Sequence, residues 1–136
     1  MTWIGAAACC LNARAELLMV LQGKPDEERL WSIPAGGCEK GETLEACCVR
    51  EVREETGYEV EIRRKLFEKR GEFDGQGVEV HYFDVVAVGG EARIQDPDGL
   101  IHDVAWRSAE DISHLNLSFP EDRAHLLQFI ADGMMG

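Results

Sequence analysis

Three glutamates that lie close together in the sequence, Glu51, Glu54 and Glu55, are the residues best placed to do chemistry. They belong to the segment Thr43–Thr56, which contains neither Gly nor Pro and is predicted to be a helix. Carboxylate oxygens are the ligands that Mg²⁺ and Mn²⁺ prefer, and Mg²⁺ usually combines a few carboxylates with water and substrate phosphates. The three glutamates therefore predict a divalent metal site that serves phosphate chemistry.

The apolar residues of this helix lie on the same side as the glutamates. With about 100° of rotation per residue, one arc of roughly 160° holds the glutamates together with Leu44, Cys47, Cys48 and Val52. Carboxylates that continue an apolar stripe repel one another while they are partly desolvated. Arg50 and Arg53 lie about 100° and 160° from the centre of the stripe, so neither is expected to neutralise all three. A metal ion is favoured over the alternative of a solvated acidic face with intrahelical ion pairs.

The length, composition and net charge of the chain indicate what kind of protein to expect. A chain of 136 residues with 45% hydrophobic content fits one domain over residues 1–136. The net charge of −12 argues against a nucleic-acid polymer as partner, although bound cations allow an acidic protein to accept a phosphate substrate. No stretch reaches the roughly 20 apolar residues of a membrane span, and the first residues lack the basic region of a signal peptide. We therefore expect a cytoplasmic protein without a membrane partner.

Strands and a second helix are expected around the acidic helix. Strands are predicted at 3–10 and 16–21, paired as a hairpin, and at 31–33, 59–69, 78–88 and 102–106, with a sharp turn at 34–37. Thr43 is the expected N-cap of the first helix and Gly57 ends it. A second amphipathic helix begins near 118–121 and buries Leu126, Leu127 and Ile130. This order predicts an α/β/α sandwich with a mixed β-sheet between helices.

The segment from Gly36 to Tyr58 resembles the signature of the Nudix hydrolase family. It reads GGCEKGETLEACCVREVREETGY and fits the pattern G-x5-E-x7-R-E-U-x-E-E-x-G-U, in which U is a bulky apolar residue. Tyr58 is a mild departure, because an aliphatic residue is usual there. The resemblance implies the Nudix α/β/α fold and the hydrolysis of a nucleoside diphosphate linked to another group, with water attacking phosphorus.

The resemblance also implies roles for individual residues. Glu51, Glu54 and Glu55 would be the metal ligands for Mg²⁺, with Mn²⁺ as a substitute, and the backbone carbonyl of Ala35 is a further candidate ligand. Glu42 would support the metal or its water. Arg50 would orient the glutamates through charge-assisted hydrogen bonds.

The general base is not given by the resemblance. Many relatives place a glutamate six residues before the tryptophan of a late strand, but in this chain Trp106 puts Leu100 there. Asp98 is the nearby candidate for the role, although aspartates beside Pro and Gly often form turns. Glu42 and Glu54 are the alternatives.

Substrate recognition is expected to involve Arg29, Phe73, His81 and Phe83, because nucleobases are held by stacking and a few hydrogen bonds. The alternatives are core packing for Phe83 and an exposed strand position for His81. The substrate is expected to be a small nucleotide-like molecule such as a nucleoside triphosphate, ADP-ribose or a nucleotide sugar.

Two other functions use the same fold. A sensor would bind a nucleotide or metabolite without turning it over, which the residue at position 100 could explain. An isomerase of isoprenoid diphosphates would need a reactive cysteine near the pocket; Cys38 lies in the turn of the box, but no nearby residue suggests an activated thiolate. A homodimer is a further possibility, since dimers are common among the relatives.

Overall fold

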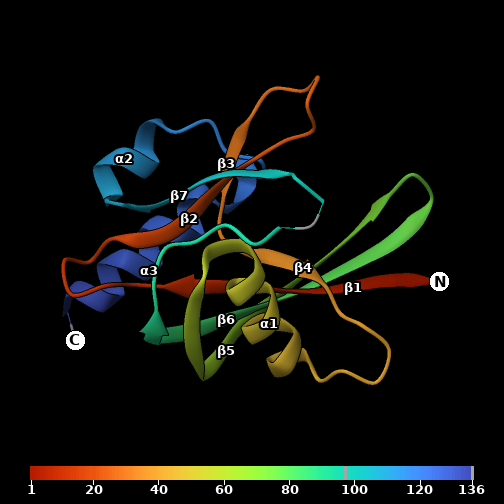
Figure 1. Ribbon diagram of the computed structural model, residues 1–136, viewed down its shortest axis with the longest axis horizontal. Helices are drawn as coiled ribbons and strands as arrows, with labels where there is room; N and C mark the ends of the chain where they lie inside the picture. The colour runs from red at the N-terminus through yellow and green to blue at the C-terminus, as the bar shows by residue number, and fades with distance from the viewer. Residues whose placement is uncertain (97, 136) are drawn as a thin grey trace.

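The computed structural model describes residues 1–96 and 98–135, which form a mixed α/β fold (Figure 1). The elements follow one another in the order β1 Thr2–Cys10, β2 Leu17–Gln22, β3 Leu30–Ser32, β4 Ala35–Gly37, α1 Leu44–Thr56, β5 Tyr58–Phe73, β6 Gln76–Gly90, β7 Ile101–Arg107, α2 Ala109–His114, the 3₁₀ turn η1 Pro120–Asp122 and α3 Arg123–Met135. No helix among the described residues is long and apolar enough to cross a membrane.

The strands form two sheets. A mixed four-stranded sheet has the order β4-β1-β6-β5, in which β1 runs parallel to β6 and the other neighbours are antiparallel. An antiparallel three-stranded sheet has the order β3-β2-β7. The β5–β6 hairpin is the longest pairing, and in Figure 1 its tip lies on the same side of the molecule as the N-terminal end of β1.

Strand β1 shows how the strands are enclosed between helices. Its residues from Ala6 to Cys10 are all buried, but alternate residues belong to different cores. Ala7 and Cys9 pack with α2 and α3 residues such as Ile112 and Ile130, whereas Ala6, Ala8 and Cys10 pack with residues of α1. The helices therefore cover the strands from two sides, as the α/β/α expectation requires.

The predicted core positions of the last helix are confirmed in the main. Leu126 and Ile130 of α3 are buried, and Leu127 is partly buried against the same core. The amphipathic pattern of this segment therefore identified the side of the helix that packs on the strands.

The expected hairpin between the first two strands is wrong. Strands β1 and β2 belong to different sheets and are joined only by an isolated bridge between Leu11 and Leu17. The reason is that β1 is a central strand, buried on both faces and paired along both edges by β4 and β6. A continuous apolar run of this kind shows that a strand is buried but not which strand lies beside it.

Two local expectations are also corrected. The segment 34–37, expected as a turn, contains the short strand β4, whose residues pair with Gly5, Ala6 and Ala7 of β1. The helix α2 was not expected; it is a six-residue helix with a capping box in which Ser108 and Asp111 exchange hydrogen bonds. The last helix begins later than expected, because η1 precedes it.

The ends of α1 are those expected from the sequence. The Thr43 side chain accepts a hydrogen bond from the backbone N–H of Ala46, and Gly57 ends the helix in the left-handed conformation with φ of 85°. A Cβ atom on Gly57 would lie 2.3 Å from the carbonyl oxygen of Glu91. The close approach places the loop after β6 beside the C-terminal end of α1.

We expect Gly57→Ala to lower the free energy of unfolding by roughly 2–4 kcal/mol, because the left-handed conformation and the contact with Glu91 both oppose a side chain. Urea unfolding followed by circular dichroism measures the change. Gly71→Ala is the matched control, since nothing lies within 4 Å of a Cβ atom at Gly71. Equal stabilities of the two variants would contradict this account of Gly57.

Candidate active site

The short strand β4 and the helix α1 bring the acidic residues together. The backbone N–H of Ala35 donates a hydrogen bond of 3.1 Å to Oε1 of Glu55. A Cβ atom on Gly36 would lie 2.1 Å from the carboxyl carbon of Glu51, so only glycine leaves room for that side chain. The metal-ligand candidates Glu51 and Glu55 therefore lie directly against the backbone of β4.

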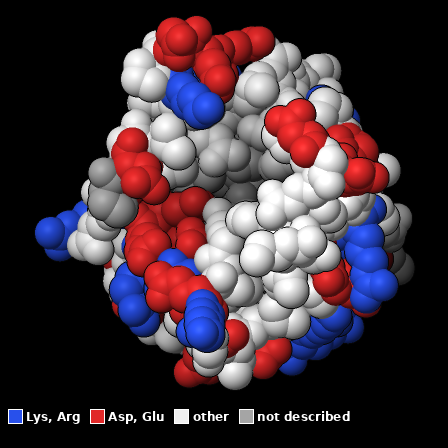
Figure 2. Space-filling view, turned by 90° about the vertical axis from the view of Figure 1, so that its right-hand side faces the viewer, with Lys and Arg blue, Asp and Glu red and all other residues white. Residues whose placement is uncertain are grey.

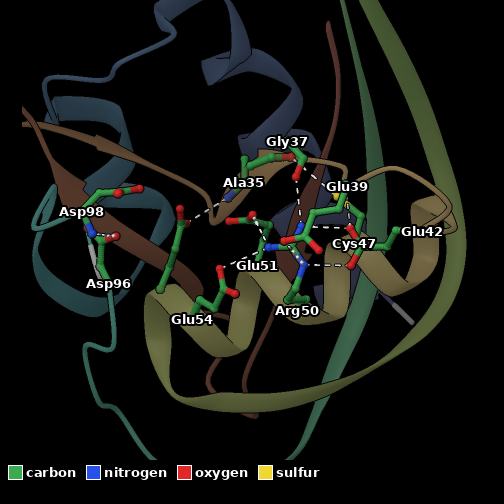
Figure 3. A network of polar contacts seen from close by, with 12 residues as sticks. Ala35, Gly37, Glu39, Glu42, Cys47, Arg50, Glu51, Glu54, Asp96 and Asp98 are labelled. Carbon is green, nitrogen blue, oxygen red and sulfur yellow. Dashed lines mark hydrogen bonds and ion pairs between the residues drawn. The ribbon is translucent and has the colours of Figure 1, made fainter.

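Arg50 is the centre of the polar network in Figure 3. Its guanidinium donates to both carboxylate oxygens of Glu42, at 2.8 and 2.9 Å, and to the carbonyl oxygen of Gly37 at 2.9 Å. It also donates to Glu51 at 2.8 Å and to Glu54 at 3.2 Å. The long side chain thus reaches two of the three helical glutamates, more than its angular position on the helix suggests, but it does not reach Glu55.

The carboxylates of the network differ in their electrostatic surroundings. The hydrogen bonds from Arg50 lower the pKa of Glu42 to about 2, so this side chain stays ionised. Burial raises the pKa of Glu51 in spite of the neighbouring Arg50. Burial also raises the pKa of Glu55, to about 8, and the charges of Glu51, Asp96 and Glu54 add to the effect. Among the described residues, Glu55 is therefore a carboxylate whose ionised form is compensated by the backbone N–H of Ala35 but by no cationic side chain.

Asp98 lies on the loop that follows β6. This loop is held against the end of α1 by backbone hydrogen bonds from Arg93 to Thr56 and from Gln95 to Glu54, at 2.7 and 3.1 Å. Figure 3 shows Asp96 and Asp98 near the Glu54 end of the network. Asp98 is exposed, and no hydrogen bond or ion pair joins it to the glutamates of α1 within residues 1–96 and 98–135.

Asp96 has a structural role in the same loop. Its Oδ2 accepts hydrogen bonds from the backbone N–H groups of Leu100 and Ile101, and its Oδ1 accepts one from Asp98. These bonds are those of a turn-forming aspartate. Within residues 1–96 and 98–135, the carboxylate of Asp98 accepts no such hydrogen bonds from the backbone of the loop.

A cavity of about 740 Å³ opens beside the acidic network. Ala35 and Gly36 form part of its wall, and aromatic residues line other parts of it, among them Trp3, Phe73 and Phe119. Figure 2 shows the hollow, with acidic side chains gathered along one side and uncharged surface around much of the rest. The backbone that contacts the glutamates on one side therefore borders the cavity on the other.

The cavity has a polar region that the sequence did not suggest. Asp122, which is buried, accepts a hydrogen bond of 2.7 Å from the Tyr82 hydroxyl and one of 3.0 Å from the Lys69 ammonium. The same ammonium lies 4.7 Å from the centre of the Phe119 ring. These side chains come from β5, β6 and η1, and no local pattern in the sequence connects them.

Only Phe73 of the four expected substrate-binding residues lines the cavity. Arg29 is exposed on the loop before β3 and does not line the cavity. Phe83 is 2% exposed and packs in the core beneath α1, which corrects its proposed contact with substrate. His81 also lies outside the lining, because Val80 and Tyr82 point into the cavity and alternate strand residues face opposite ways.

Comparison with known proteins agrees with this geometry. The family described as NUDIX domain matches residues 1–129. The chain belongs to the Nudix family. Nudix hydrolase 5 of Arabidopsis thaliana is 31% identical over 111 residues, which cover 79% of this chain and 37% of that protein. Nucleoside triphosphatase NudI of Escherichia coli K12 is 31% identical over 104 residues, covering 65% of this chain and 68% of that protein.

A solved structure of a Nudix relative shows the same fold. The NUDIX hydrolase from Nitrosomonas europaea superposes with a TM-score of 0.84 at 21% identity and covers 98% of this chain and 90% of its own. The Nudix domain described here spans about a quarter to two thirds of the length of the curated relatives that it matches.

The acidic network of this Nudix domain fits a hard divalent cation. Glu51, Glu54 and Glu55 supply oxygen donors, and Glu55 contacts no cationic side chain in the described part of the chain. A buried carboxylate with a raised pKa is the group whose ionisation a bound cation would favour. All of these donors are oxygen atoms, the ligands that hard divalent cations prefer.

The metal-free protein is expected to lose stability as the pH rises. The pKa of Glu55 is about 8 in the folded protein and about 4.3 in an unfolded chain, so the protonated form favours folding. This contribution is complete below about pH 4.3 and is lost as the pH rises through about 8. Urea unfolding in EDTA, between about pH 5 and about pH 9, should therefore show a fall in stability that is smaller in Glu55→Gln.

Glu61→Gln is the control for this measurement, because Glu61 is an exposed residue of β5. It should retain the pH dependence of the original chain. If Glu55→Gln retained it as well, the titration of Glu55 would not be its cause.

Proposed function

We propose that this Nudix domain is a metal-dependent hydrolase that cleaves the diphosphate linkage of a nucleoside triphosphate or a related nucleoside diphosphate derivative. The proposal rests on the observation that Ala35 and Gly36 border both the acidic network and the cavity. These residues contact Glu55 and Glu51 on the side of α1 and line the cavity on the other. A nucleoside in the cavity would place its phosphates along β4, next to the carboxylates.

The cavity suits a nucleoside in size and chemistry. Its volume of about 740 Å³ is in the usual range for small-molecule sites. The rings of Trp3 and Phe119 are 41% and 46% exposed and offer surfaces for stacking of a base. Asp122 offers a carboxylate at the polar region for hydrogen bonds from N–H groups of the base.

The relatives favour a nucleoside triphosphate among the possible substrates. The E. coli relative is named a nucleoside triphosphatase, and it aligns with this chain over two thirds of its own length. ADP-ribose and nucleotide sugars are the alternative substrates, since they present a nucleoside and a diphosphate in the same order.

Glu51, Glu54, Glu55 and the backbone carbonyl of Ala35 are the groups that would hold Mg²⁺ or Mn²⁺. Such an ion, when bound, polarises phosphate oxygens and lowers the pKa of water. Arg50 holds Glu51 and Glu54 in position, and its bonds keep Glu42 ionised. The chain thus supplies an arranged set of carboxylates before the substrate binds.

We assign Glu54 as the proton acceptor as well, through the carboxylate oxygen that would not hold the ion. Its side chain is 42% exposed, whereas that of Glu51 is 13% exposed and Glu55 is bonded to the backbone of Ala35. Glu54 also receives the longest of the Arg50 hydrogen bonds to the glutamates, at 3.2 Å. Water therefore reaches Glu54 more easily than the other two. Asp98 is the alternative acceptor, from the neighbouring loop.

We expect Glu54→Gln to reduce turnover by roughly 10²–10⁴-fold, the usual contribution of a general base. The assay measures phosphate release, with and without inorganic pyrophosphatase, from nucleoside triphosphates, ADP-ribose and nucleotide sugars in Mg²⁺ or Mn²⁺. Asp98→Asn is tested beside it, and a larger loss in that variant would transfer the role to Asp98. Tight nucleotide binding without turnover of any substrate would contradict the hydrolase and support the sensor.

The residues that line the cavity lead to a second prediction, which concerns binding of the substrate. The ring of Trp3 lies against Gly5 and Gly37 and lines the cavity. Trp3→Ala should raise KM roughly tenfold and change kcat little, because loss of base stacking costs about 1–3 kcal/mol. Ile4→Ala is the matched control, since Ile4 is equally exposed, at 41%, and does not line the cavity. Equal KM values for the two variants would place the base elsewhere.

A further inference from the structure

A second group of potential metal ligands lies on the β5–β6 hairpin. One ligand atom from each of Glu68, Glu79 and His81 lies within 4.8 Å of the other two. Glu68 is paired with His81 across the two strands, and Glu79 lies two residues before His81 on β6. No ion pair within the described ranges joins these residues to the glutamates of α1. The group is therefore a second set of potential ligands, none of which belongs to the candidate metal ligands of α1.

The imidazole of His81 is the distinctive member of this group. His81 is only 7% exposed, and its Nδ1 is a buried atom without a hydrogen-bond partner in the described structure. Its Nε2 lies 3.0 Å from Oε1 of Glu79. An ionised carboxylate cannot donate a proton, so the neutral tautomer that suits the contact with Glu79 carries its proton on Nε2 and leaves a free lone pair on Nδ1.

The free lone pair faces a second carboxylate. Nδ1 lies 3.8 Å from Oε2 of Glu68, which is too long for a hydrogen bond. Two ligands of a tetrahedral zinc ion, with bonds of about 2.0–2.2 Å, lie roughly 3.4 Å apart. A shift of a few tenths of an ångström would let one ion bind both atoms. The contact of Nε2 with the Glu79 carboxylate pairs the imidazole with the kind of group that commonly orients a metal-binding histidine.

Arg70 is a cation that contacts both carboxylates. One nitrogen of its guanidinium lies 3.1 Å from Glu68 and 3.3 Å from Glu79. The Arg70 side chain is 70% exposed, so it can move into solvent. Lys65 lies 3.9 Å from the other oxygen of Glu68. A positive charge is thus already favoured between the two strands.

We propose that Glu68, Glu79 and His81 form a second metal site, which binds Zn²⁺ or a similar divalent transition-metal ion after displacement of Arg70. Imidazole suits these ions, whereas Mg²⁺ prefers oxygen ligands alone. The ion would connect β5 to β6 on the face of the hairpin opposite to Val80 and Tyr82, which line the cavity.

The test is a titration of ¹⁵N-labelled protein with Zn²⁺ in excess Mg²⁺, in which NMR follows the histidine ring nitrogens. The His81 signals are assigned by their loss in His81→Gln. Zinc should shift the Nδ1 resonance of His81 while Nε2 keeps its proton. If zinc binds at the glutamates of α1 instead, the ring of His81 will not respond, and that result would overturn the proposal.

Zinc affinities, measured by competition with a chromophoric chelator, give a second readout. Glu79→Gln should weaken binding roughly 10–100-fold, as loss of a partner of a metal-binding histidine does. Arg70→Gln should strengthen binding, because it removes the competing cation from an exposed position that folding does not require. Glu61→Gln, on the same strand, should leave the affinity unchanged. A failure of Arg70→Gln to strengthen binding, with no loss in Glu79→Gln, would contradict the site.

Discussion

The repulsion among carboxylates on the inner side of α1 is the constraint on which the site depends. Glu51 and Glu55 continue the stripe that buries Cys47, Cys48 and Val52, so they lie where ionised groups are least favoured. Arg50 compensates part of this charge through its contacts with Glu51 and other acidic residues. The negative charge that Arg50 does not compensate lies mainly at Glu55. A site with an excess of negative charge is suited to a cation that arrives with an anionic substrate.

The small size of the β4 residues, one alanine and two glycines, connects this charge to the cavity. Gly36 allows the Glu51 carboxylate to lie against the strand, and the N–H of Ala35 bonds to Glu55. A strand with larger side chains would separate the carboxylates from the cavity by the width of those side chains. The backbone of β4 therefore contacts the acidic network on one side and borders the cavity on the other.

Side chains alternate along β6, so the β5–β6 hairpin also presents two different faces. Val80 and Tyr82 face the cavity, whereas His81 and Glu79 point to the other face. One strand thereby contributes to two chemically different surfaces. Its partner β5 does the same, since Lys69 contacts Asp122 at the cavity while Glu68 lies near His81.

The sequence alone determined the features that depend on neighbours along the chain. The limits of α1 follow from Thr43 and Gly57, and the grouping of its glutamates follows from helical periodicity. The family signature lies within one loop and one helix, so it could be recognised without the fold. The strands of the β5–β6 hairpin were also predicted, at 59–69 and 78–88, although the structure extends them to Phe73 and Gln76.

Only the tertiary structure decided which distant segments meet. It placed β1 between β4 and β6 rather than beside β2, and it joined Trp3, Lys69 and Asp122 around one cavity. It also buried Phe83 and turned His81 away from the cavity, although both had the residue types of substrate contacts. The physical reason is that side-chain type and periodicity indicate which residues are buried. Which residues they then contact depends on how strands far apart in the chain pair with one another.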